Sequence, residues 1–545
     1  MQDFYQSHWI LTFLIVFPLV GALAAYLSGE KAARNVALGV GIIEFLVSLP
    51  LFWTFQPGER CDTFERGPAF QNCADLAWIP DWGIRYQIGM DGISLFMVLL
   101  TTFLLPLMVL GSWTYIRDRR RGFYASLLGL TAGVVGVFVA LDMFLFYVFW
   151  EVMLIPMYFM IGIWGGKERI YAAVKFFLFT TVGSLLMLVA ILFLFWQWTG
   201  AHPGQPSFSY FDFLTLHLTP MQQVLLFYAF ALAFAIKVPV FPFHTWLPHA
   251  HVQAPTAGSV VLAGVLLKMG TYGFIRFALP LFPDMAHFPS TVYWAMVLGV
   301  VGIIYTAMVA AVQGNAKRLV AYTSVAHLGF VILGIFASVL ATRPLPGGQV
   351  VGSGNLLGMQ GALLVMIGHG LSTPMLFFLL GMLYERRHSY EIDDFGGLAA
   401  SVPVFATLLV FAGMASVGLP TTAGFVAEFL VLLGTFQQHP WFALIAGTGV
   451  IFAAYYMLPM MQKVVFNALN KPANRSIPDL NARELAILLP LVALILWLGI
   501  YPKPVLDRMA PAARDVVSAA QQSRLAPNAP AVPAGQGGVA INGGR

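Results

Sequence analysis

Long, continuously apolar runs dominate the chain, and short polar stretches separate them. A hydrocarbon core of about 30 Å takes roughly 20 helical residues to cross. About fourteen runs reach that length, near residues 8–27, 33–55, 91–116, 122–140, 142–164, 171–198, 220–249, 256–279, 291–311, 317–341, 360–384, 402–437, 441–462 and 482–500. Because the runs are continuous rather than short and alternating, they indicate helices and not barrel strands. The pattern predicts an all-α polytopic membrane protein with about 14 transmembrane helices.

Composition agrees with this class of protein. Hydrophobic residues make up 59% of the 545 positions and charged residues 10%, against roughly 25% charged in soluble domains. We expect residues 1–500 to form one integral membrane unit. Residues 501–545 form a tail, with a surface helix at 505–524 and a disordered stretch from Pro527 onward. The first run has neither a basic stretch before it nor a small-residue cleavage site after it, so we expect a retained segment.

The basic residues indicate the orientation. Assigning the loops alternately to the two sides puts 16 Lys and Arg on one side, with Lys317 among them, and five on the other. The five are Arg60, Arg66, Arg85, Arg276 and Arg343. By the positive-inside rule, both termini lie outside. The net charge of +5 therefore reflects this asymmetry and gives no reason to invoke nucleic acid.

Two of the apolar segments carry helix breakers. Pro239 and Pro242 follow Lys237 in the seventh, and Gly418 and Pro420 interrupt the twelfth. Interrupted helices at corresponding positions of two halves indicate the transport site in transporters built from repeats. Because the breaks lie five segments apart, an odd number, we expect segments 4–8 and 9–13, about 122–279 and 291–462, to form two inverted five-helix repeats.

Glu151 and Lys237 are isolated charges deep inside apolar segments. Such charges insert at a free-energy cost of roughly 2.5–3.5 kcal/mol each and mark function by default. A nearby carboxylate favours the charged form of a lysine, whereas burial favours its neutral form. Moving Glu151 relative to Lys237 would therefore take up or release a proton. The alternative is a static ion pair that ties two helices together.

Further titratable groups lie at mid-depth in later segments. Lys268 stands too far from either surface to reach water, so it is either a proton relay or a lysine that bonds carbonyls freed by the neighbouring break. His327 and His369 suit proton transfer near neutral pH, although a lone helical histidine is often only a hydrogen-bonded core residue. Glu428 follows the second break and is the expected far end of the relay.

Three histidines, His244, His249 and His251, cluster after the first break. Pro248 interrupts any helical face that could hold a metal, so proton uptake or loop structure is the preferred interpretation. The two cysteines, Cys61 and Cys73, both fall in the loop between segments two and three. They form a disulfide if that loop faces an oxidising space, or remain free thiols.

No Walker A motif, dinucleotide fingerprint or iron–sulfur cysteine set is present in the sequence. Residues 237–259, KVPVFPFHTWLPHAHVQAPTAGS, and 267–276, LKMGTYGFIR, resemble the proton-antiporter-like subunits of respiratory complex I. Residues 149–156 and 424–429 share the likeness. A lysine in LLKMG together with a glutamate after the second break is typical of the subunit M, or chain 4, family.

The resemblance implies a proton-translocating membrane subunit of NADH:quinone oxidoreductase in a bacterial-type inner membrane, bound to sister antiporter-like subunits. NADH, FMN, iron–sulfur clusters and quinone would reside in partner subunits, and this chain would hold no cofactor. Carried over by position, Glu151 modulates Lys237, Lys268 and His327 bridge the halves, and Glu428 leads to the outer exit. The family often has Asp where this chain has His249. The alternatives are a sodium/proton antiporter subunit of the same superfamily and a structural membrane scaffold.

Overall fold

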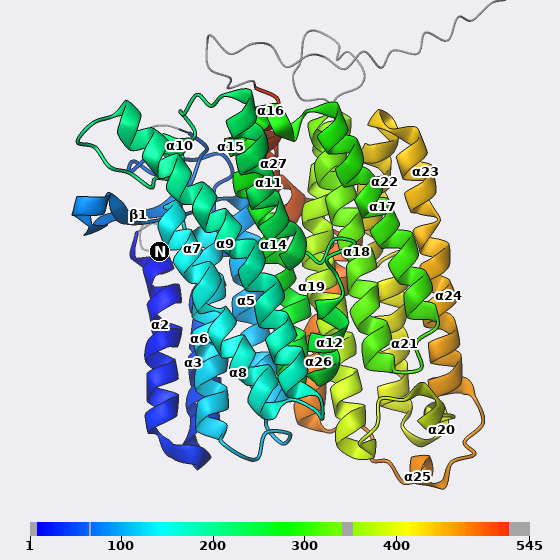
Figure 1. Ribbon diagram of the computed structural model, residues 1–545. Coiled ribbons are helices and arrows are strands. Elements are labelled where there is room, and N and C mark those ends of the chain that lie inside the picture. The colour runs from blue at the N-terminus through cyan, green and yellow to red at the C-terminus, as the bar shows by residue number, and fades with distance from the viewer. Residues whose placement is uncertain (1–7, 65–66, 341–352, 523–545) are drawn as a thin grey trace, which may run out of the picture.

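The computed structural model describes residues 8–64, 67–340 and 353–522, which form a bundle of long helices (Figure 1). Thirteen helical stretches in this part of the chain are long and apolar enough to cross a membrane. They are α2 (Trp9–Leu27), α3 (Gly29–Ser48) with α4 (Leu51–Thr54), α5 (Gly92–Gly111), α6 (Arg120–Val139), α7 (Met143–Val152) with α8 (Leu154–Trp164), α9 (Arg169–Ala201), α11 (Pro220–Lys237), α13 (Thr256–Val261) through α15 (Leu279–Leu281), α17 (Pro289–Ala311), α18 (Ala316–Val339), α19 (Ser353–Arg387), α23 (Pro440–Gly447) with α24 (Gly449–Met461) and η6 (Gln462–Phe466), and α26 (Ala482–Ile500).

A fourteenth crossing consists of two shorter apolar helices, α21 (Pro403–Val417) and α22 (Ala423–Gln438). The predicted all-α membrane bundle is therefore confirmed. Short helices lie in the connections: α10 (Tyr210–Phe213), α12 (Trp246–Gln253), α16 (Pro283–Ala286), α20 (Leu398–Ser401), α25 (Pro472–Arg475) and the 3₁₀ turns η1 (Pro80–Trp82) and η5 (Ile392–Asp394).

Both predicted breaks are present. α11 ends at Lys237, and residues 238–245 turn before α12 begins. α21 ends at Val417, and Gly418 takes a φ of 90° before α22 begins at Ala423. Proline removes a backbone donor, and glycine alone adopts positive φ freely, so both sequences end a helix. Each break places an ionisable residue, Lys237 or Glu428, next to irregular backbone.

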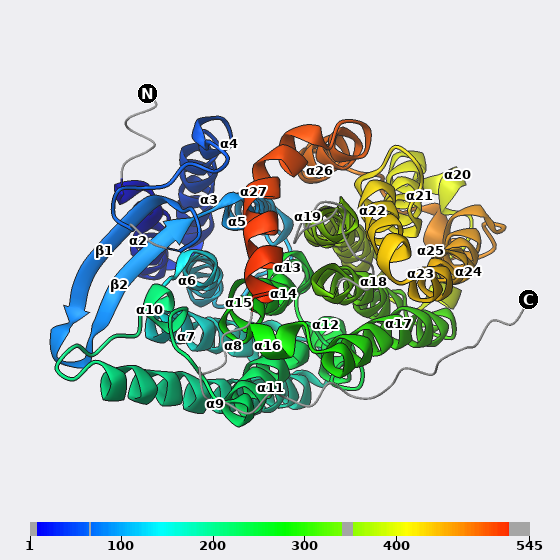
Figure 2. The same ribbon diagram turned by 90° about the horizontal axis from the view of Figure 1, so that it is seen from above.

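The most deeply buried helices stand at the centre of the bundle. They are α13 to α15, α18 and α19, which lie between the cyan helices of the first half and the yellow helices of the second in Figure 2. The helices next to them pack closely: a Cβ built on Gly329 of α18 would come 2.7 Å from the carbonyl oxygen of Gly299 on α17. Side chains on these central helices are therefore shielded from lipid.

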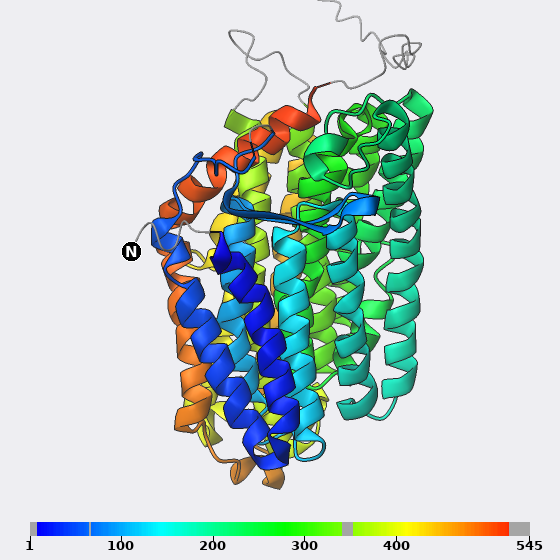
Figure 3. The same cartoon turned by 90° about the vertical axis from the view of Figure 1, so that its left-hand side faces the viewer.

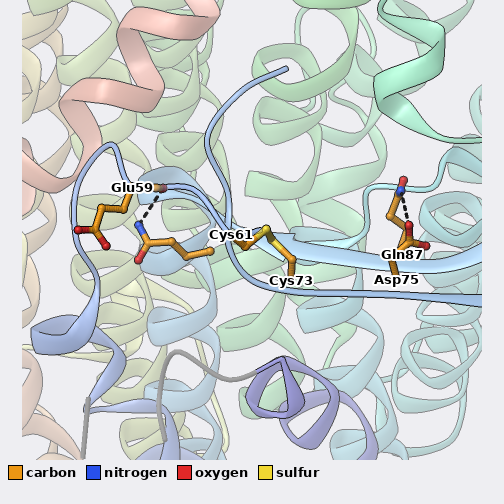
Figure 4. Close-up of a disulfide and its surroundings, with 6 residues drawn as sticks. Glu59, Cys61, Cys73, Asp75 and Gln87 are labelled. Atoms are coloured by element: carbon orange, nitrogen blue, oxygen red, sulfur yellow. Dashed lines mark hydrogen bonds between the residues drawn. A yellow bond between two sulfur atoms is a disulfide. The ribbon is translucent and has the colours of Figure 1, made fainter. Parts of the chain in front are cut away.

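One end of the bundle carries a β-hairpin that the sequence analysis missed. Strands β1 (Gln71–Ile79) and β2 (Ile84–Met90) pair antiparallel, and Gly83, at φ 66°, completes the turn. A disulfide joins Cys61 to Cys73 beside the hairpin (Figure 4), which decides between the two alternatives left open for these cysteines. We call this the hairpin end, and the end with the loops around Arg117 and Lys167 the basic end.

A C-terminal helix, α27 (Lys503–Ala520), crosses the hairpin end (Figure 2, red). Its apolar face is buried through Val505, Met509, Ala513 and Val517. The backbone carbonyl of Leu506 accepts a hydrogen bond from Gln360 Nε2 of α19 at 3.1 Å. α27 thus lies where a helix was expected at 505–524 and packs onto the bundle, whereas the stretch from Pro527 onward lies outside the described residues.

Candidate functional site

Lys268 lies at the centre of the molecule with no exposed surface. It belongs to α14 (Leu267–Gly273), which is flanked by two π-helical turns, η2 (Leu262–Leu266) and η3 (Phe274–Ala278). Widened turns of this kind disturb the regular backbone pairing and are frequent at functional sites. The Lys268 ammonium donates a hydrogen bond to the Ala263 carbonyl of η2. The carbonyl that binds this lysine therefore comes from its own helix, and not from the break after Lys237.

The second partner of Lys268 is His369 on α19. The Lys268 Nζ and His369 Nδ1 atoms are 2.6 Å apart. The His369 ring lies 5.6 Å, centroid to centroid, from the ring of His327 on α18. His369 Nε2 is buried without a hydrogen-bond partner among the described residues. The sequence placed both histidines at mid-depth, and the structure brings them together beside Lys268.

His327 in turn contacts Glu428. Its Nδ1 atom lies 2.8 Å from the Glu428 Oε1 atom, and its Nε2 atom lies 3.2 Å from the Ser416 hydroxyl. Glu428 stands beside the second break, since a Cβ built on Gly418 would lie 3.7 Å from Oε2. A small cavity bordered by both histidines, Ser372 and Glu428 has room for about one water molecule. Lys268, His369, His327 and Glu428 thus form a continuous series across four helices.

Glu151 and Lys237 are near each other but form no ion pair among the described contacts. Lys237 is 1% exposed, and its ammonium lies 3.8 Å from the Met153 sulfur, where α7 meets α8. The ammonium also lies 5.2 Å from the Trp150 ring centroid and 5.8 Å from that of Phe176. The static ion pair considered from the sequence is therefore not what the structure contains.

Lys237 and Lys268 stand on packed helices. A Cβ built on Gly270, two residues after Lys268, would come 2.7 Å from the Phe234 carbonyl of α11 and from the Val238 side chain. In a low-dielectric interior, a charge on one lysine disfavours a charge on a lysine nearby. The contact at Gly270 therefore places the end of α11, which carries Lys237, directly against the helix that carries Lys268.

The three histidines after the first break have different surroundings. His244 faces the rings of Tyr305 and Tyr322, and His249 Nδ1 lies 3.3 Å from the Lys175 ammonium. His251 is fully buried and stacks on Phe377, with ring centroids 4.6 Å apart. The described residues contain no group of three or more His, Cys, Asp or Glu side chains arranged to hold a metal ion.

Sequence reasoning placed two buried cations in loops, and both assignments were wrong. Lys317 is 2% exposed and donates to the Ala254 carbonyl at 2.6 Å. Arg276 is 1% exposed and forms an ion pair with Asp91 at the start of α5. Two opposite charges within predicted segments, Arg276 in 256–279 and Asp91 in 91–116, were the signal that could have suggested this pair.

Two parts of the sequence match models of known protein families. Residues 140–454 match "NADH:quinone oxidoreductase/Mrp antiporter, TM", and residues 75–135 match "NADH-ubiquinone oxidoreductase chain 4, amino terminus". The chain belongs to the subunit M, or chain 4, family of NADH:quinone oxidoreductase. One relative is the NADH-quinone oxidoreductase subunit M of Rhodobacter capsulatus. It is 45% identical to this chain over 523 residues, which cover 93% of this chain and 96% of the relative. The Escherichia coli (strain K12) member is 42% identical over 508 residues, covering 91% and 96%.

Solved structures agree with the family assignment. A chain of "Respiratory complex I from Thermus thermophilus with bound NADH" superimposes with a TM-score of 0.80 at 31% identity, covering 94% of this chain and all of that one. A chain of the Mrp complex from Dietzia sp. DQ12-45-1b has the same fold, with a TM-score of 0.77 at 18% identity, covering 94% and 99%. The resemblance found in the sequence is thus confirmed, and this family member is a multi-pass membrane protein.

Proposed function

We propose that this chain translocates protons as a membrane subunit of NADH:quinone oxidoreductase, through a lateral series of buried Lys, His and Glu side chains. The observation that carries the proposal is the contact series from Lys268 through His369 and His327 to Glu428. Every member can gain or lose a proton. Lys268 to His369 and His327 to Glu428 are direct contacts, and one water in the adjoining cavity is enough to link the two histidines.

The first break supplies the switch. Lys237 lies against Met153 and two aromatic rings. Burial disfavours the charged form of this lysine, and only the attraction of the ring faces favours it. Glu151 is close enough to interact electrostatically with Lys237, so a movement of Glu151 toward the ammonium favours protonation of Lys237. Charging Lys237 then disfavours the charge on Lys268 and drives its proton toward His369.

The second break supplies the outlet. Glu428 lies beside the irregular backbone at Gly418 and receives the proton through His327. His244, which follows the first break, serves proton uptake from the basic end. In this scheme residues 122–279 and 291–462 are two inverted halves, and protons pass between them along the central helices.

The energy source lies outside this chain. NADH, FMN, iron–sulfur clusters and quinone reside in partner subunits, with sister antiporter-like subunits as membrane neighbours. The subunit lies in the lipid bilayer of a bacterial-type inner membrane. The hairpin end and both termini face the periplasm, and the basic end faces the cytoplasm by the positive-inside rule.

The test is to purify the tagged chain in mild detergent and to assay it for NADH:quinone activity that a quinone-site inhibitor blocks. We expect co-purifying redox subunits and inhibitor-sensitive activity. Recovery without redox subunits, together with sodium-dependent proton exchange in vesicles, would instead establish a sodium/proton antiporter. Recovery in the redox assembly with no change in pumping after substitution of the relay residues would establish a scaffold.

A further inference from the structure

On one side of the bundle α5 lies between α3 and α26, with α27 crossing their ends (Figures 2 and 3). An apolar groove is lined by residues of these helices. Its volume is about 520 Å³, and all sixteen residues that line it are apolar. The groove runs from the hairpin end, at Trp53 and Val505, to mid-depth on α19, at Ile367 and Leu371. In a membrane-spanning surface, such a groove holds something apolar.

The size of the groove selects among apolar occupants. A transmembrane helix about 10 Å across and 30 Å long fills roughly 2,400 Å³, more than four times the volume of the groove. A neighbouring subunit could therefore cover the groove but not fill it with a helix. A hydrocarbon chain is thinner and flexible, and it can enter from the outer leaflet.

The groove has a cationic group at its hairpin end. The Arg508 guanidinium of α27 lies 4.2 Å from the ring centroid of Phe52, which lines the groove, and Nε donates to the Phe52 carbonyl at 2.8 Å. Arg508 forms no ion pair with any described residue. Trp53, beside it, is 66% exposed, as expected of a tryptophan at a membrane interface. A phosphate is the group that an arginine in this position is suited to bind.

The inner part of the groove lies against α19, the helix that carries His369. Ile367 and Leu371 flank His369 along α19, and both line the groove. Gly370 packs on Leu100, which also lines it, since a Cβ on Gly370 would come 2.4 Å from the Leu100 side chain. Because residues two apart lie on opposite sides of a helix, the groove meets the side of α19 that faces away from His369, and its occupant packs against the back of the helix that carries this histidine.

We propose that this groove binds one phospholipid, with an acyl chain along α5 and α26 and the headgroup phosphate on Arg508. The lipid completes the apolar wall behind His369. This site is independent of whether the relay translocates protons, because it depends only on the shape of the groove and on the charge at its end.

The experiment measures the phospholipid that each assembly retains. Wild type and three variants are purified in their native assembly, washed repeatedly with detergent, and analysed for lipid by mass spectrometry and for phosphorus. Ala493→Phe places a ring in the groove. Ala24→Phe, on the exposed face of α2 outside the groove, is the matched control.

We expect wild type and Ala24→Phe to retain one more phospholipid per chain than Ala493→Phe. Arg508→Gln, which leaves the groove open, is expected to lower the retained phospholipid to less than half of the wild-type amount. Equal retention in wild type, Ala493→Phe and Arg508→Gln would overturn the proposal, as would recovery of an isoprenoid quinone in place of phospholipid. Should Ala493→Phe fail to assemble, the Arg508→Gln comparison decides alone.

Discussion

The ammonium nitrogen of Lys268 lies 2.6 Å from Nδ1 of His369, although the two residues are 101 positions apart. This contact joins α14 to α19 at the centre of the bundle, and the histidine then stands against His327. The middle of the proposed proton path therefore depends on His369, which the path implied by the resemblance, from Lys268 to His327, did not include.

Replacing His369 tests that dependence. His369→Leu keeps an apolar side chain of similar size and removes the group between Lys268 and His327. We expect proton pumping per NADH oxidised to fall about tenfold or more, since loss of a positioned proton carrier slows transfer at least that much. The measurement is the quenching of a pH-sensitive dye in proteoliposomes that contain the purified assembly.

The matched control is Thr373→Val, one turn further along α19. Thr373 is fully buried, and its hydroxyl has no hydrogen-bond partner among the described residues. Its replacement is expected to leave pumping near the wild-type value. Normal pumping in His369→Leu would mean that protons bypass this histidine.

Glu428→Gln tests the far end of the series. The amide keeps the size of the side chain but cannot accept a proton from His327, so we expect a loss of pumping comparable to that of His369→Leu. Ser416→Ala removes only the hydrogen bond between Ser416 and His327, and one such bond contributes about 1 kcal/mol. If Glu428→Gln pumps protons as well as Ser416→Ala, Glu428 does not take part in proton transfer.

The Arg276–Asp91 pair has a structural role that thermal denaturation can measure. Both side chains are at most 3% exposed, and removing one member of a buried pair typically costs about 3–5 kcal/mol. Arg276→Leu is therefore expected to lower the melting temperature of the purified assembly. Asp91 also caps α5 by accepting the amides of Ile93 and Ser94.

A second substitution separates the charge from the cap. In Arg276→Leu/Asp91→Asn, the asparagine still caps α5 and leaves no unpaired carboxylate, so part of the stability returns. Arg85→Ala, which breaks the more exposed pair with Asp75, is expected to change stability by at most about 1 kcal/mol. A double variant no more stable than Arg276→Leu alone would show that the unpaired charge is not the cause.

The disulfide between Cys61 and Cys73 can report the orientation of the subunit, because the sequence contains no other cysteine. In right-side-out vesicles, a membrane-impermeant reductant followed by an impermeant maleimide is expected to label both cysteines. Omitting the reductant is the control and should abolish labelling. Labelling only in inverted vesicles would place the hairpin end in the cytoplasm.

Sequence patterns were enough for the features that depend on neighbouring residues. Pro239 and Pro242 end a helix wherever they occur, so the break after Lys237 could be placed without a structure. The length of the apolar runs likewise gave the crossings. The turn at Pro80 to Gly83 was also a local signal for the hairpin, but the loop around it was read only for its cysteines.

The contacts between distant segments could not be predicted in this way. Nothing in the sequence around Lys268 indicates that segment 11 packs beside segment 8, so its contact with His369 was missed. The π-helical turns on either side of Lys268 have no proline or other local signal. Lys317 was placed in a loop because it opens a segment, yet packing against Ala254 and Tyr390 buries it.

The central claim is that these buried charges move protons rather than hold helices together, and Lys237→Met tests it most directly. The ammonium of Lys237 is surrounded by Met153, Trp150 and Phe176, so a methionine fits the site and packing is preserved. We predict that the variant assembles in normal amounts and loses proton pumping in proteoliposomes. Pumping at the wild-type level in a fully assembled Lys237→Met variant would contradict the account.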